Sequence, residues 1–154
     1  MIIKPKGEIE LIIDYKDDSK EIIKFPNTVL DGGRAALASS LANSIGDSYD
    51  FFISKMVFGD GGTTSGVPKY VDSSRNGLFG TTRVSKPVIS IIDPDVNTQV
   101  VFTSVIAFDE GNTYVLSEMA LQMYNGDLYS MVTFPDLTKT SSMQLTYNWR
   151  LSFV

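Results

Sequence analysis

The last stretch of the chain, Met143 to Val154, constrains the fold more than any other. Its apolar and polar side chains alternate without a break, with the apolar ones at Met143, Leu145, Tyr147, Trp149, Leu151 and Phe153. In a β-strand successive side chains point to opposite faces, so the pattern predicts one face in a core and the other in water. Such a long half-buried strand needs neighbouring strands and a second layer over its apolar face. We therefore expect the rest of the chain to build a β-rich domain around it.

Composition limits both the size of the fold and the chemistry available to it. The chain has 154 residues, 43% of them hydrophobic, which predicts one domain over residues 1–154. It contains no cysteine and no histidine, which excludes disulfides, thiolate zinc sites and the usual catalytic triads. A net charge of −5 argues against nucleic-acid binding. We also expect no signal peptide and no membrane span, because no apolar run approaches the ~20 residues that a span needs.

The first third of the sequence predicts a hairpin followed by a helix. Residues 8–15 and 20–25 read as two short strands joined by the polar turn 16–19. The only convincing helical pattern runs from about 29 to 43, with Asn27 or Thr28 as its cap. Gly32-Gly33 weakens the first turn, so a start with Asp31 as the cap is an alternative. The narrow, alanine-rich apolar stripe indicates a helix lying close against a sheet.

A glycine-rich segment follows the next predicted strand, which covers residues 49–58. Residues 59–87 hold six of the twelve glycines and show no clear periodicity, so we expect a long loop. The segment is basic although the protein is acidic. We predict that it contacts partner molecules through its cationic and aromatic side chains, namely Lys69, Tyr70, Arg75, Phe79, Arg83 and Lys86.

The remaining sequence predicts a short strand at 88–92 and then a three-stranded meander. Its strands are expected at 98–108, 113–124 and 127–134, with Asn125-Gly126 as a two-residue hairpin turn. The expected registers place Phe102 beside Met119, Met119 beside Val132, and Met123 beside Leu128 on a single face. The middle strand also has apolar residues on its other face, which predicts a central strand covered on both sides. Tyr124, Tyr129 and Met131 lie on that other side and indicate a second buried layer or a subunit contact. The predicted fold is a mainly β, single-domain antiparallel sandwich with one helix (about 29–43) and a glycine-rich loop (59–87).

Three groups of residues suggest chemistry, and none of them completes a known site. The glycine run 59–64 lacks the Gly-Lys-Ser/Thr ending of a phosphate-binding loop. Asp93, Asp95 and Asn97 match the first half of a calcium-binding loop and are weak candidates for metal ligands. The residues that follow them lack the glycine and the bidentate glutamate that such a loop requires. The carboxylates Glu118, Asp109 and Glu110 fit turns and solvated strand faces without catalysis. We therefore predict no enzyme, no catalytic residue and no cofactor.

Three patches of sequence resemble a known class of protein. They are residues 134–139 followed by Trp149-x-Leu151-x-Phe153, residues 27–38 with Asn27-Thr-Val-Leu and Gly33-Arg34, and Phe58-Gly-Asp-Gly-Gly62. Together they resemble small β-rich structural proteins of tailed bacteriophage virions, which occur in collars, fibre-attachment pieces and capsid decorations.

The resemblance implies a non-enzymatic virion protein of the neck, tail or fibre-attachment region, made in the host cytoplasm. It implies a symmetric oligomer whose partners are copies of itself and other virion proteins, with no nucleic acid and no membrane. A capsid decoration protein is one alternative. The other is a carbohydrate-binding or adhesive β-sandwich with exposed aromatic residues and a cation at Asp93 to Asn97.

Overall fold

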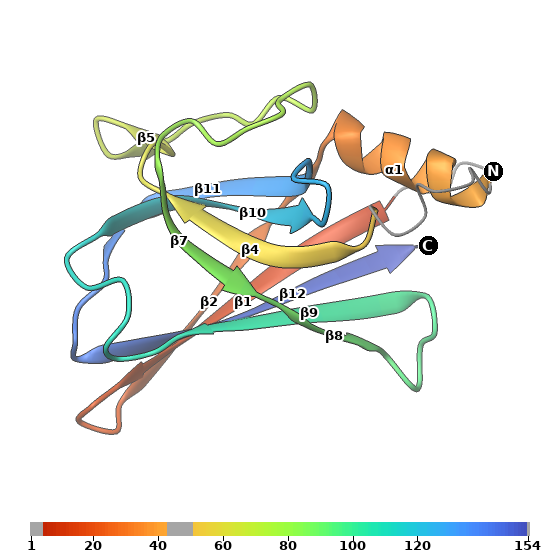
Figure 1. The fold of residues 1–154 in the computed structure, drawn as a ribbon. Helices are drawn as coiled ribbons and strands as arrows, with labels where there is room; N and C mark the ends of the chain where they lie inside the picture. Colours follow the sequence, from red (N-terminus) through yellow and green to blue (C-terminus); the bar gives the residue numbers. More distant parts are fainter. Residues whose placement is uncertain (1–4, 43–50, 154) are drawn as a thin grey trace.

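The computed structural model describes residues 5–42 and 51–153, which form two antiparallel five-stranded sheets packed face to face (Figure 1). The first sheet, sheet A, has the order β2 (Lys20–Pro26), β1 (Pro5–Tyr15), β12 (Met143–Phe153), β9 (Gln99–Ile106) and β8 (Ile89–Ile92). The second, sheet B, has the order β3 (Thr28–Val29), β11 (Leu128–Thr138), β10 (Val115–Met123), β4 (Ile53–Gly59) and β7 (Thr82–Pro87). The predicted mainly β sandwich is confirmed.

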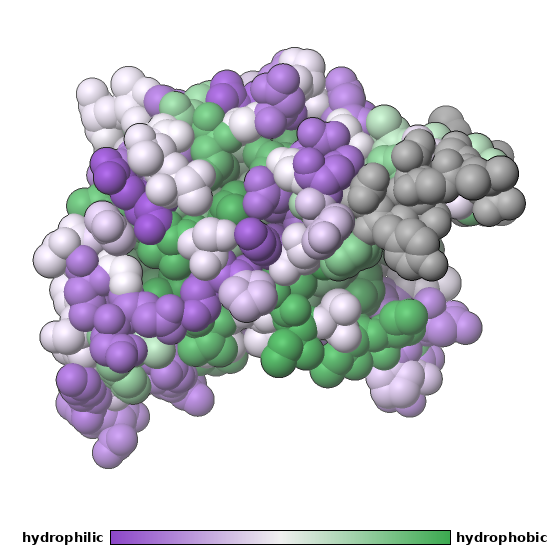
Figure 2. Space-filling view, in the orientation of Figure 1, coloured by the Kyte–Doolittle hydropathy of each residue, from purple (hydrophilic) through white to green (hydrophobic). Residues whose placement is uncertain are grey.

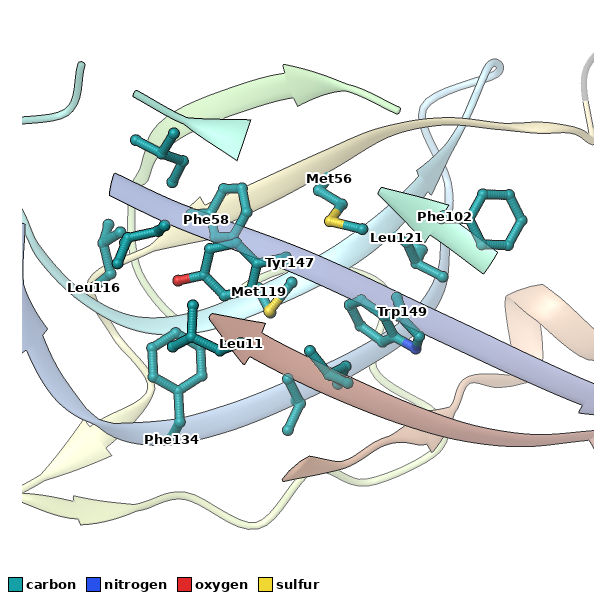
Figure 3. Close-up of a cluster of buried hydrophobic side chains, with 14 of the residues drawn as sticks. Leu11, Met56, Phe58, Phe102, Leu116, Met119, Leu121, Phe134, Tyr147 and Trp149 are labelled. Atoms are coloured by element: carbon teal, nitrogen blue, oxygen red, sulfur yellow. The ribbon is translucent and has the colours of Figure 1, made fainter. Parts of the chain in front are cut away.

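Strand β12 is the middle strand of sheet A, as its alternating pattern requires. It pairs with β1 on one side and β9 on the other, so that Trp149 lies between Ile9 and Phe102. Tyr147 and Trp149 are fully buried. Figure 3 shows them among side chains of the opposite sheet, and the Tyr147 ring lies 4.8 Å from that of Phe58 between centroids. The core is therefore shared by the inner faces of both sheets.

The N-terminal hairpin is confirmed, whereas the helix is shorter than predicted. Helix α1 spans Asp31–Leu41, and its N-cap is Leu30 with no side-chain cap, so Asn27 and Thr28 do not cap it. Strand β3 occupies Thr28–Val29 instead and pairs with β11, because the β-branched residues complete the edge of sheet B. The expected helix end at residue 43 lies outside the described residues.

One of the two glycines that weaken the helix explains why the helix lies so close to β11. Gly33 is buried against β11, and a Cβ atom there would lie 2.4 Å from the carbonyl oxygen of Tyr129. Only a residue without a side chain allows the helix to approach the strand this closely. Ala36 is the other buried residue of the helix, which fits the predicted alanine-rich contact with a sheet.

The predicted three-stranded meander is wrong in one of its two connections. Strand β9 pairs with β12 and β8 in sheet A, whereas β10 lies in sheet B, so residues 107–114 cross from one sheet to the other. Phe102 and Met119 share the core but come from opposite sheets. Alternation specifies only which face of a strand is apolar. It therefore did not distinguish a neighbour within a sheet from a strand across the sandwich.

The second predicted connection, the hairpin of β10 and β11, is confirmed with a change of register near its turn. Met119 pairs with Val132 as expected. A bulge near the turn shifts the pairing, so Leu128 lies opposite Gln122 rather than Met123.

The turn of this hairpin has three residues rather than the predicted two, because Met123 donates its N–H to the carbonyl oxygen of Asp127 and Gly126 donates its own to that of Met123. Gly126 adopts a positive φ of 96°, whereas Asn125 does not adopt the positive φ that the two-residue turn requires.

The glycine-rich segment is only partly a loop. It contains a small hairpin of β5 (Thr63–Thr64) and β6 (Val67–Pro68), and it ends in β7, which forms an edge of sheet B. We call residues 60–81 the flap, because they cover the outer face of sheet B (Figure 1). Val71 packs there in a second apolar cluster with residues of β10 and β11. Strand β10 is therefore central and covered on both faces, as predicted.

Candidate functional site

A buried carboxylate on β10 holds the flap against the sheet. Glu118 is fully buried, and its carboxylate accepts hydrogen bonds from the backbone N–H groups of Gly61 (3.0 Å), Phe79 (2.7 Å) and Gly80 (2.8 Å). Oriented backbone N–H groups compensate a buried negative charge much as they bind anions in nests. The acceptor positions of Glu118 are thus used within the chain, and the side chain serves to fix the two ends of the flap.

Two neighbouring side chains extend this attachment. The Oγ of Ser117 accepts a hydrogen bond from the N–H of Gly62 at 2.8 Å. The approach is so close that a Cβ atom at position 62 would lie 1.9 Å from the carbonyl oxygen of Ser117. Asp60 accepts the N–H of Thr81 and the Nε–H of Arg83, at 2.9 and 2.7 Å. The hydrogen bonds from Arg83 and Thr81 hold the pKa of Asp60 below its usual value. The flap is therefore ordered by contacts within the chain.

The cationic residues predicted to contact partners also have partners inside the chain. The guanidinium of Arg75 lies 3.6 Å from the ring centroid of Phe79, and the Nζ of Lys69 lies 4.9 Å from the same centroid. Arg83 pairs with Asp60, and Lys86 pairs with Glu110 at 2.6 Å, which lowers the pKa of that glutamate. Tyr70, by contrast, is 85% exposed and projects from the flap.

A buried lysine holds the crossover between the sheets, and the sequence pattern gave no sign of it. The Nζ of Lys139 donates to the Oδ1 of Asn112 and the carbonyl oxygen of Thr140, both at 3.0 Å, and to that of Phe108 at 3.4 Å. Burial lowers the pKa of Lys139, and the charges of Asp109 and Glu110 oppose this shift. The structure does not bring Glu110 and Glu118 together as a catalytic pair, since one lies in the crossover and the other beneath the flap.

The weak metal candidates Asp93, Asp95 and Asn97 lie in a turn. Hydrogen bonds within this turn already occupy one carboxylate oxygen of Asp93. The Oδ1 of Asp93 accepts the N–H groups of Asp95 (2.9 Å) and Val96 (3.2 Å). Within residues 5–42 and 51–153, no three acidic, histidine or cysteine side chains gather as metal ligands. Over the same residues, no helix is long and apolar enough to cross a membrane.

The three residues that the sequence placed on the outer side of the hairpin differ in their surroundings. Met131 is buried in the second apolar cluster, as the second-layer interpretation predicts. Tyr129 is buried in the main core cluster instead, and burial raises its pKa to about 12. Tyr124 is 65% exposed and stacks on Phe52, with 5.2 Å between ring centroids.

An apolar patch lies at one edge of sheet A. Ile89, Ile91 and Ile92 of β8 are 70%, 61% and 66% exposed. Figure 2 shows apolar surface below and right of centre, where Figure 1 places β8. The sequence predicted a strand here but not that it forms an edge, because edge position depends on the pairing of the whole sheet.

Fold and site together define a β-sandwich structural module, whose buried charged groups hold loops in place rather than face a substrate cleft. The chain belongs to the family described as phage tail-collar fibre protein, N-terminal, which matches residues 24–151. No curated protein and no solved structure matches the chain. The protein is therefore a structural component of a bacteriophage tail that assembles with other virion proteins, as its sequence resemblance implied.

Proposed function

We propose that this domain forms a symmetric oligomer in the neck or fibre-attachment region of the tail, and joins its neighbours through the flap and its sheet edges. The proposal includes synthesis in the host cytoplasm before incorporation into the virion. Exposed isoleucines on β8 are the observation that carries it. Contiguous apolar side chains at an open sheet edge are typical of surfaces that become buried in an assembly.

The flap supplies the second proposed contact surface. Its six candidate residues lie on or beside a segment that Glu118 and Asp60 hold in place, so little conformational entropy is lost when a partner binds. Tyr70 projects outward, and Phe79 lies between two cations. Tyrosine and arginine are enriched among the residues that contribute most to protein interfaces.

Mass measured by light scattering over a range of protein concentrations tests this function. We expect the mass to rise to a defined multiple of 17.0 kDa. A monomer at every concentration would contradict self-assembly, and a melting temperature raised by calcium or by sugars would favour the carbohydrate-binding alternative. Limited proteolysis run alongside reports whether the flap becomes further protected on assembly.

Incorporation of variants into phage particles tests the role of the flap. We expect Tyr70→Ala to reduce incorporation, because it removes an exposed aromatic contact without disturbing the Glu118 attachment. Tyr124→Ala is the matched control, since Tyr124 is also exposed but lies at the β10–β11 turn. Equal incorporation of both variants and the parent chain would argue against a flap contact.

A further inference from the structure

Two asparagines of the chain are followed directly by glycine, namely Asn76-Gly77 in the flap and Asn125-Gly126 at the β10–β11 turn. Such an asparagine is open to attack by the next backbone nitrogen, because glycine has no side chain to hinder the approach. Asn76 and Asn125 are both exposed, and no atom lies within 4 Å of the position that a Cβ would occupy on either glycine. Access to solvent therefore does not distinguish the two pairs.

Hydrogen bonds protect the pair at the β10–β11 turn. Gly126 donates its N–H to the carbonyl oxygen of Met123 at 2.9 Å. The side chain of Asn125 is also held, since its Oδ1 accepts the N–H of Asp127 at 2.9 Å and its Nδ2 donates to the Oδ2 of that aspartate at 3.3 Å. The nitrogen and the side chain that would have to meet are both engaged in other contacts.

The pair in the flap lacks these restraints. Among the residues that the structure describes, neither the N–H of Gly77 nor the side chain of Asn76 has a hydrogen-bond partner. The carbonyl oxygens of Gly77 and Leu78 accept from the Nε and Nη2 of Arg75, both at 3.2 Å. The guanidinium thus lies beside Gly77, where its positive charge stabilises the negative charge that develops when the backbone nitrogen attacks.

We propose that Asn76 is a site of spontaneous deamidation in the folded protein, whereas Asn125 is protected. The Gly77 nitrogen loses its proton to hydroxide and attacks the Cγ of Asn76, which forms a new N–Cγ bond. The Cγ–Nδ2 bond breaks, and the Nδ2 group leaves as ammonia with a proton from water. The resulting succinimide ring is opened by water at either of its carbonyl carbons, which gives aspartate or isoaspartate at position 76. The net reaction consumes water and releases ammonia, with no oxidation or reduction.

Either product changes the flap close to its attachment to β10. Both add a negative charge next to Arg75, whose guanidinium stacks on the ring of Phe79. Isoaspartate also inserts a methylene group into the main chain, shortly before Phe79 and Gly80 donate their N–H groups to Glu118. The modified flap is therefore less cationic and held less firmly. We expect this to weaken its contact with other virion proteins, a consequence that rests on the proposed function.

Peptide mapping of the isolated folded chain by mass spectrometry, after storage at mildly alkaline pH, tests the chemistry. We expect Asn76 to deamidate at least roughly tenfold faster than Asn125, because the hydrogen bonds of the turn have to open before Asn125 reacts. The rate at Asn76 should rise with pH, since the nitrogen attacks only after it loses its proton. An Asn76 that stays intact, or that reacts no faster than Asn125, overturns the proposal.

Unfolding in urea is the control for the influence of neighbouring residues on each pair. The two rates should converge there, because the hydrogen bonds that protect Asn125 are lost. A difference between the rates that persists unchanged in urea would mean that local sequence and not the fold protects Asn125, which also overturns the proposal.

Glutamine variants identify the source of the released ammonia. Glutamine has to close a larger and less favoured ring, so Asn76→Gln should remove most of the ammonia released by the folded chain. Asn125→Gln is the matched control and should leave the release unchanged. Circular dichroism establishes that each variant is folded. The opposite result, with loss of ammonia only in Asn125→Gln, contradicts the assignment.

Incorporation into phage particles separates the chemistry from its effect. Asn76→Asp carries the added charge from the start, and we expect it to be incorporated less than Asn76→Gln. Equal incorporation of the two variants would overturn the effect on the contact and uphold the deamidation. The mapping uses the isolated chain, so its result stands whether or not the domain self-associates.

Discussion

At the scale of single residues, the buried polar side chains act on loops. Glu118 is surrounded by backbone N–H groups of the flap, and Lys139 by oxygens of the crossover and the residue after it. Backbone N–H groups of the flap donate to Glu118, whereas Lys139 donates to oxygens of the crossover and of Thr140, so each buried charge is compensated by hydrogen bonds with otherwise irregular segments. Long irregular segments are thereby fixed on a sandwich that has neither disulfides nor the residues of a catalytic triad.

We expect Glu118→Gln to lower the free energy of unfolding by about 2–3 kcal/mol, the usual range for charge-assisted hydrogen bonds to a buried group. The amide retains one acceptor oxygen but turns a donor toward backbone donors. Urea unfolding measures the change. Glu8→Gln on the exposed face of sheet A is the control and should change stability by less than about 0.5 kcal/mol. Equal stability of the two variants would show that the Glu118 contacts contribute little.

The burial of Tyr147 predicts how the free energy of unfolding changes at alkaline pH. Burial raises the pKa of Tyr147 above its usual value near 10, so the folded protein keeps a proton that the unfolded chain releases. This contribution to stability is complete below pH 10 and is lost as the pH rises further. The hydroxyl has no hydrogen-bond partner among the described residues.

Tyr147→Phe should therefore reduce the loss of stability above pH 10. At neutral pH it should leave the free energy of unfolding unchanged or raise it by up to about 1 kcal/mol, since it removes an unpaired buried hydroxyl. Urea unfolding at pH 7 and at pH 10.5 checks both statements. Destabilisation at pH 7 by much more than this would mean that the hydroxyl is hydrogen-bonded in solution.

At the scale of elements, the flap depends on glycine where its backbone meets β10. Gly62→Ala places a methyl group against the carbonyl of Ser117, so the flap has to move away from the sheet. We expect cleavage within residues 63–81 to become at least about tenfold faster, because proteases cut segments that open locally.

Gly77→Ala is the matched control for the flap. No atom lies within 4 Å of the position that its Cβ would occupy, so the added methyl group meets open space. Its cleavage rate should equal that of the parent chain. Comparable acceleration in both variants would mean that the flap is loosened by any change of glycine and not by the contact with Ser117.

At the scale of the whole molecule, the chain changes sheets twice within a short span, at Pro87-Val88 and again at residues 107–114. Strands β7, β8, β9 and β10 therefore link sheets B, A, A and B in sequence order. The inner faces of the two sheets contribute to the same hydrophobic core. Neither sheet can lose its strands without exposing the apolar face of the other.

We therefore expect both sheets to unfold in a single transition. Trp149, the only tryptophan, reports on sheet A by fluorescence, and far-ultraviolet circular dichroism reports on all strands. The two signals should give the same urea midpoint within error. Separate midpoints would show that one sheet retains structure without the other.

The sequence predicted the elements better than their arrangement. The alternation in β12, the N-terminal hairpin and the β10–β11 hairpin rest on local patterns, and each was found, although the turn at Asn125-Gly126 has three residues instead of the predicted two. The partner of β9 was predicted wrongly, because its alternation suits either sheet of a sandwich. Glu118 was noted only as a strand carboxylate, since nothing near it in the chain reveals the flap that approaches from residues 61 and 79–80.

Side-chain alternation and residue types are local properties of the chain, so they were enough to predict which faces of the strands are buried and which catalytic chemistries are excluded. The edge position of β8, the folding of the glycine-rich segment over β10, and the burial of Glu118 and Lys139 became visible only in the folded chain. These features depend on strands and loops far apart in sequence. Their pairing follows from the packing of the whole core, which no local pattern records.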